Sequence, residues 1–159
     1  MRRYDPRMAI LIGGLVAGIL DITAAILITL WYGGSPVRML QGIASGAIGK
    51  PAFDGGMPTA LLGLAFHFLI AFTATAVFYL ASRRIRFLTE KPVVAGVLYG
   101  IAVYLFMFFV VQRLAGLHPR FTVVSVTRMV IVHVLCVGLP IALAVRRYAA
   151  IGSRPVQPA

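Results

Sequence analysis

Four long apolar runs divide the chain, and polar residues fill the connections between them. The runs cover about residues 8–31, 57–81, 92–111 and 121–145. About 20 helical residues cross the ~30 Å hydrocarbon core of a bilayer, so each run predicts one transmembrane helix. The pattern therefore predicts an all-α bundle of four transmembrane helices, which forms one domain over residues 1–148.

The connection between the first two runs predicts a further helix over about residues 36–48. Ser35-Pro36 supplies a capping hydroxyl followed by proline at the first helical position. The face opposite the apolar one is expected to carry Arg38, Gln41 and Ser45. An amphipathic helix lying in the outer interface is the less demanding arrangement and is favoured. A re-entrant helix that is covered by protein is the alternative.

Composition and charge support a membrane protein. The 159 residues are 60% hydrophobic and 12% charged, whereas a soluble domain carries about 25% charged residues. The net charge of +11 does not predict a nucleic-acid partner, because the cations lie mainly at the ends of the apolar runs. The expected partner is the lipid bilayer. Cys136, the single cysteine, lies in the fourth run and provides no disulfide framework.

The distribution of cations predicts the topology. Ten flank one end of the predicted bundle: Arg2, Arg3, Arg7, Arg83, Arg84, Arg86, Lys91, Arg146, Arg147 and Arg154. Four flank the other end: Arg38, Lys50, Arg113 and Arg120. The positive-inside rule then places both termini in the cytoplasm. The first run is too long for a signal peptide and is interpreted as a retained helix. Residues 149–159 are predicted to form a disordered tail.

Three ionisable residues lie near the middle of their runs: Asp21, His67 and His133. Each is about 20 Å from the predicted cytoplasmic end, at 1.5 Å of rise per residue. A charge at this depth costs roughly 2.5–3.5 kcal/mol, so it should face protein or water. We predict a shared polar centre that handles a proton or a small ligand. Alternatively, the three residues only clamp helices, at about 0.6 kcal/mol per hydrogen bond. Candidate accessory residues are Arg128, Tyr104 and Gln41.

Small residues at helical spacing predict close contacts between helices, because they let backbones approach. The glycines concerned are Gly14, Gly18, Gly63, Gly96 and Gly100. Glycine faces that are not used for packing within the bundle would suit contact with a second copy of the chain, in a homo-oligomer, or with another membrane protein. In the fourth run, Pro140 cannot donate to the carbonyl of Cys136, which predicts a kink near His133.

Three classes of function follow from these residues. The first is binding or translocation of a proton or small solute through the polar centre. The second is a structural or assembly subunit. The third is a redox subunit in which His67 and His133 hold a b-type haem. An enzyme is not expected, since the chain lacks a phosphate-binding glycine loop, a nucleophile elbow and a metalloprotease motif. No metal is predicted, because a two-histidine, one-carboxylate iron site needs an open polar pocket.

Several segments resemble a group of small four-span bacterial inner-membrane proteins of unknown function. They are residues 18–22, 35–46 and 52–56, followed by His67. The group is more remotely similar to YagU-type membrane proteins, and the likeness covers most of residues 8–145. Its third span often ends in an Asn-Phe-Val-Val-like segment, where this chain has Phe108 in place of the asparagine. The resemblance implies a four-span fold in the bacterial inner membrane and no established activity.

Overall fold

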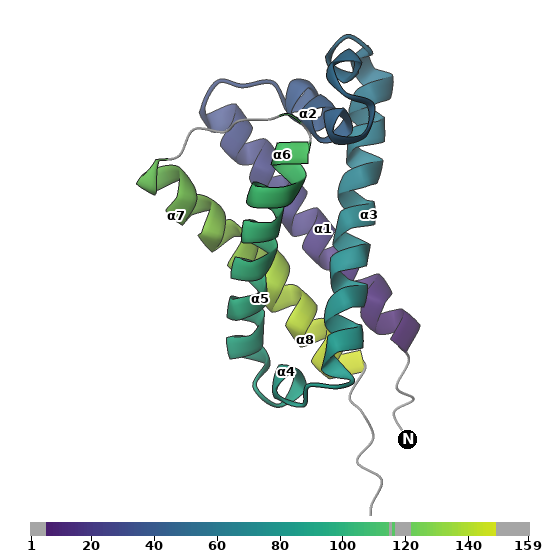
Figure 1. Cartoon of the computed structure of the whole chain (residues 1–159), viewed down its shortest axis with the longest axis vertical. Helices are drawn as coiled ribbons and strands as arrows, with labels where there is room; N and C mark the ends of the chain where they lie inside the picture. Colours follow the sequence, from purple (N-terminus) through teal and green to yellow (C-terminus); the bar gives the residue numbers. More distant parts are fainter. Residues whose placement is uncertain (1–5, 115, 117–121, 149–159) are drawn as a thin grey trace, which may run out of the picture.

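The structure is a computed structural model that describes residues 6–114, 116 and 122–148 (Figure 1). In this part of the chain every regular element is helical, and four helices are long and apolar enough to cross a membrane. These four helices are Pro6–Trp31, Gly56–Ser82, Pro92–Val111 and Val123–Tyr148. They confirm the predicted all-α bundle of four helices, and they make the chain a multi-pass membrane protein.

The first two spans are the uninterrupted helices α1 (Pro6–Trp31) and α3 (Gly56–Ser82). The connection between them holds α2 (Pro36–Ile48) and the short 3₁₀ helix η1 (Lys50–Phe53). One turn of helix, α4 (Phe87–Glu90), precedes the third span.

The third and fourth spans each contain a π-helical segment. The third span is α5 (Pro92–Phe106) followed by the π-helical η2 (Met107–Val111), and α6 (Gln112–Leu114) extends it. The fourth span is α7 (Val123–Val132), the π-helical η3 (His133–Gly138) and α8 (Leu139–Tyr148). The sequence predicted a distortion near His133, and η3 begins at that residue. Pro140 explains it, because it has no N–H to donate to the preceding turn.

Helix α2 is fastened between α1 and α3 at one end of the bundle (Figure 1). The Ser35 side chain accepts a hydrogen bond from the Arg38 backbone N–H at 3.4 Å, as its capping role predicted. Gly63 of α3 lies directly against the backbone of Leu40, so any side chain at position 63 would collide with α2. The expectation that α2 turns its polar face away is wrong for Gln41 and Ser45, which are both buried. The position of α2 relative to the bilayer surface stays a prediction.

Close backbone crossings hold the four spans together. Helix α1 packs against α3 and α8, and α5 packs against η3 and α8. A Cβ atom on Gly18 of α1 would lie 2.7 Å from the Phe68 ring of α3, and Gly14 faces the Phe72 ring in the same way. A Cβ atom on Gly100 of α5 would lie 2.6 Å from the Cα atom of Val134. Helices can approach this closely only where glycine removes the side chain.

The two ends of the bundle differ in packing. The largest fully buried side chains include Phe78, Ile141 and Val145, and these lie toward the end of α3 and in α8. We call this the compact end. At the opposite end, which we call the open end, α7 has no buried residue and extends outward from the bundle (Figure 1). Some sequence predictions fall outside the described residues: the placement of Arg2, Arg3, Arg120 and Arg154, and the disordered tail 149–159.

Candidate functional site

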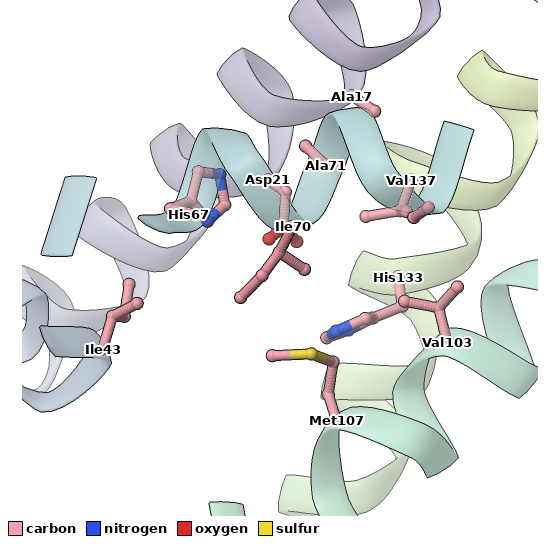
Figure 2. Close-up of a pocket in the computed structure, with 11 residues that line it drawn as sticks. Ala17, Asp21, Ile43, His67, Ile70, Ala71, Val103, Met107, His133 and Val137 are labelled. Atoms are coloured by element: carbon pink, nitrogen blue, oxygen red, sulfur yellow. The ribbon is translucent and has the colours of Figure 1, made fainter. Parts of the chain in front are cut away.

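The three predicted polar residues line one cavity of about 70 Å³. Helix α1 supplies Asp21, α3 supplies His67 and η3 supplies His133. Figure 2 shows the three side chains arranged around the same space, together with Met107. Apolar side chains form the remaining walls: Ala17, Ile43, Ile70, Ala71, Ala74, Val103, Met107 and Val137. The structure therefore brings the three residues to one level of the bundle.

The His67 ring is held across two helices. Its Nε2 atom donates a hydrogen bond to the carbonyl oxygen of Gly18 in α1, at 2.9 Å. A carbonyl oxygen can only accept, so this partner assigns the proton to Nε2. In the neutral ring, Nδ1 is then a hydrogen-bond acceptor. The edge-to-face contact with Phe68, at 5.5 Å between ring centroids, also fixes the orientation of the ring.

The His133 ring is held within its own helix. Its Nδ1 atom donates to the carbonyl oxygen of Met129, one turn earlier, at 2.8 Å. Nε2 is consequently the acceptor in the neutral ring. The buried Tyr104 ring lies against the imidazole, at 5.6 Å between centroids. Only 8% of His133 is exposed, and the residue lines the cavity.

Asp21 differs from both histidines. It is half-buried, and its side chain makes no hydrogen bond or ion pair to any other residue in 6–114, 116 or 122–148. Ionisable groups inside a membrane normally pair with one another or face a polar cavity. The cavity beside Asp21 has room for more than one water molecule, since one needs about 10–15 Å³. The carboxylate is thus available to water, a proton or a ligand.

A metal ion and a haem can each be compared with the size and the lining of this cavity. Across the described ranges, no group of three His, Cys, Asp or Glu side chains is placed to hold a metal ion. A haem between His67 and His133 would have to occupy the cavity of about 70 Å³. Pockets for ligands of drug size take about 300–1,000 Å³. The site therefore suits a proton, water or a small headgroup.

The three accessory candidates lie in different places. Tyr104 contacts His133 and adjoins the site. Gln41 does not line the cavity, because its side-chain amide donates to the carbonyl oxygen of Gly56 at 2.9 Å and fastens α2 to α3. Arg128 lies toward the open end, where Nη1 donates to the Tyr32 hydroxyl at 2.6 Å. The guanidinium carbon also lies 4.7 Å from the Tyr32 ring centroid, in cation–π geometry.

Two features of the site were not predicted. Segment η2, which begins at the wall residue Met107, contains no proline or glycine that would signal a π-helix. The Tyr99 hydroxyl donates to the carbonyl oxygen of the wall residue Ala74 at 2.7 Å. A signal for Tyr99 existed, because a phenol inside an apolar run needs an acceptor.

Comparison of the chain with models of known protein families, with curated proteins and with solved structures finds no match. The resemblance to the small four-span bacterial proteins stays a prediction.

Proposed function

We propose that this membrane protein binds and relays protons, or a small polar solute, through the centre formed by Asp21, His67 and His133. One observation carries the proposal. All three side chains line the same cavity, and within the described chain Asp21 makes no hydrogen bond or ion pair to another residue. A carboxylate that only clamped helices would have a partner, because the bilayer interior offers no other compensation.

The histidines are arranged to exchange protons without reorienting. Each ring keeps one N–H on a backbone carbonyl, which fixes the tautomer and leaves the other nitrogen free to accept a proton. An imidazolium formed at either ring is stabilised by the carboxylate that faces the same cavity. Asp21 can hold a proton or cation in the cavity that the two rings also line.

Proton flux in proteoliposomes tests this function. An imposed pH gradient is followed with an internal pH-sensitive dye, and Asp21→Asn is expected to lower the flux about tenfold or more. The matched control is Asp54→Asn, because Asp54 is an exposed acid in the connection before α3. This control should leave the flux unchanged. Equal flux in the parent and both variants would contradict the proposal.

A structural role is the second candidate, and the His67 hydrogen bond favours it. This bond joins α3 to the backbone of α1, so it clamps two spans whatever the cavity binds. Hydrogen bonds between membrane helices contribute about 0.6 kcal/mol on average and at most about 1.7 kcal/mol. If clamping is the only role, His67→Phe lowers the melting temperature, and Asp21→Asn changes neither flux nor any other transport readout.

For orientation, we propose that the compact end faces the cytoplasm of a bacterial inner membrane. The connection between α3 and α5 carries Arg83, Arg84, Arg86 and Lys91, all exposed, and the end of α8 adds Arg146 and Arg147. Excess positive charge marks cytoplasmic connections. In a Cys136→Ala background, an impermeant maleimide should label Lys50→Cys in intact cells. It should label Arg84→Cys only after permeabilisation, and the reverse pattern would overturn the orientation.

A further inference from the structure

A second hollow opens beside the polar cavity, on the side of the bundle that faces lipid. It is a groove of about 510 Å³ between α3 and the α5–η2 helix, and its lining is almost entirely apolar. Leu69 of α3 and Phe106 of α5 line it and are 59% and 57% exposed. In a bilayer these side chains contact hydrocarbon chains, so the groove is open to the lipid phase.

The groove and the cavity share part of their lining. Ile70 and Ala74 of α3, Val103 of α5 and Met107 of η2 line both spaces. A molecule lying in the groove therefore contacts residues that also line the cavity of Asp21 and the two histidines. Met107 is the most adaptable part of this wall, because an unbranched thioether side chain changes rotamer readily.

The groove between α3 and α5 ends on the side that faces the compact end. There the Tyr99 hydroxyl bonds to the carbonyl oxygen of Ala74 at 2.7 Å. The Phe78 and Tyr99 rings also meet edge to face, at 4.9 Å between centroids. These contacts join the two helices at Ala74, which belongs to the wall that cavity and groove share. The groove is thus limited on this side by specific contacts between α3 and α5.

The chemistry of the cavity selects the headgroup that it would accept. Each imidazole donates its N–H to a backbone carbonyl. In the neutral rings, Nδ1 of His67 and Nε2 of His133 are therefore left as acceptors. When it is ionised, the Asp21 carboxylate is a third acceptor and supplies a negative charge. A primary ammonium group is a cation with three N–H donors and is about the size of a water molecule, so it matches this set.

We infer that the protein binds a single-chain primary amine that enters sideways from the bilayer, with its ammonium group in the cavity and its chain in the groove. This inference rests on the proposed function and names the class of ligand for the same centre. The amphiphile fits both spaces at once, because the polar cavity and the apolar groove share a wall.

Photolabelling of the full chain in lipid nanodiscs tests the inference. The probe is hexadecylamine with a diazirine in its chain, and mass spectrometry locates the adducts. We expect adducts on α3 and α5 residues of the groove, with competition by hexadecylamine. Hexadecyltrimethylammonium is charged but has no donor, and hexadecanol has one donor and no charge, so both should compete about tenfold more weakly or worse. Equal competition by all three compounds would overturn the inference.

Two matched variants sharpen the test. Ala102→Trp fills the groove, whereas Ala65→Trp makes the same change at an exposed position of α3 outside it. Only Ala102→Trp should abolish groove labelling, provided that both variants keep the parental melting temperature. Asp21→Asn should weaken competition by hexadecylamine about tenfold. Adducts spread over all lipid-facing helices, or unaffected by Ala102→Trp, would refute the amine site. Amine-free proton flux that depends on Asp21 would then still support the proposed function.

Discussion

The two halves of the fourth span belong to one helix, yet they pack in opposite ways. In α8, Ile141, Ala142 and Val145 are completely buried, whereas α7 has no buried residue. The π-helical η3 separates the halves, and His133 is its first residue. The polar centre therefore lies where a tightly packed framework meets a loosely packed region. The framework holds the imidazole in place, and the looser region leaves space beside it.

Sequence explains this contrast. Next to the compact half, the span crosses α5 at Gly138, the last residue of η3, which lies against the backbones of Gly96 and Gly100. Helix α7 contains no glycine or alanine and is rich in β-branched valine, so no neighbouring backbone can approach it closely. Small residues thus determine where the bundle closes and where it stays open.

The largest effect is expected from Gly138→Ala, which adds a side-chain atom where the fourth span crosses α5. The new Cβ atom would collide with the backbone of Gly96 and Gly100, and neither can move as a side chain can. We expect a loss of about 3 kcal/mol or failure to fold. Gly42→Ala is the control, because no atom lies within 4 Å of the position that its Cβ would take. Thermal unfolding in detergent measures both, and equal melting temperatures would contradict the packing account.

The next largest effect is the difference in stability lost when an isoleucine of each half is replaced by alanine. Ile141→Ala removes a completely buried side chain and should cost about 2 kcal/mol or more. Ile131→Ala changes a residue of α7 that is 50% exposed and should cost less than about 0.5 kcal/mol. Unfolding by denaturant reports the difference, and similar losses for the two variants would show that the halves are equally packed.

Replacing Pro140 tests the boundary between the halves. Pro140→Ala returns an N–H donor to the helix, so the π-helical η3 should become α-helical and His133 should turn away from the cavity. Stability should change by less than about 1 kcal/mol, since one hydrogen bond is gained. Proton flux should fall to the level of Asp21→Asn. Unchanged flux, with hydrogen exchange showing a regular helix, would remove η3 from the mechanism.

The smallest effects concern two tyrosine hydroxyls. Tyr99→Phe leaves the carbonyl of Ala74 without the phenol that bonds it near the compact end, at a cost of about 1 kcal/mol. Tyr32→Phe removes the oxygen that Arg128 bonds at the exposed open end but keeps the ring under the guanidinium. Its cost should stay below about 0.5 kcal/mol. A larger drop in melting temperature for Tyr32→Phe than for Tyr99→Phe would contradict the difference in packing between the two ends.

Much of the fold could be predicted from sequence, because run length and hydropathy determine the number of spans. The sequence also predicted a shared depth for Asp21, His67 and His133, since helix rise converts position into height, and the structure places all three around one cavity. The partners of the imidazoles could not, because backbone carbonyls give no sequence signal. The contact of Gly63 with α2, and the opening between α3 and α5, likewise depend on how whole helices pack.

The most direct test of a shared polar centre is infrared difference spectroscopy of the carboxyl C=O band during a pH titration. Asp21→Asn identifies the band by deleting it, and Asp54→Asn should leave it unchanged. If the three side chains share one cavity, the Asp21 band should change its frequency and titration midpoint in both His67→Gln and His133→Gln. A band that neither substitution moves would show that the acid and the imidazoles are independent of one another.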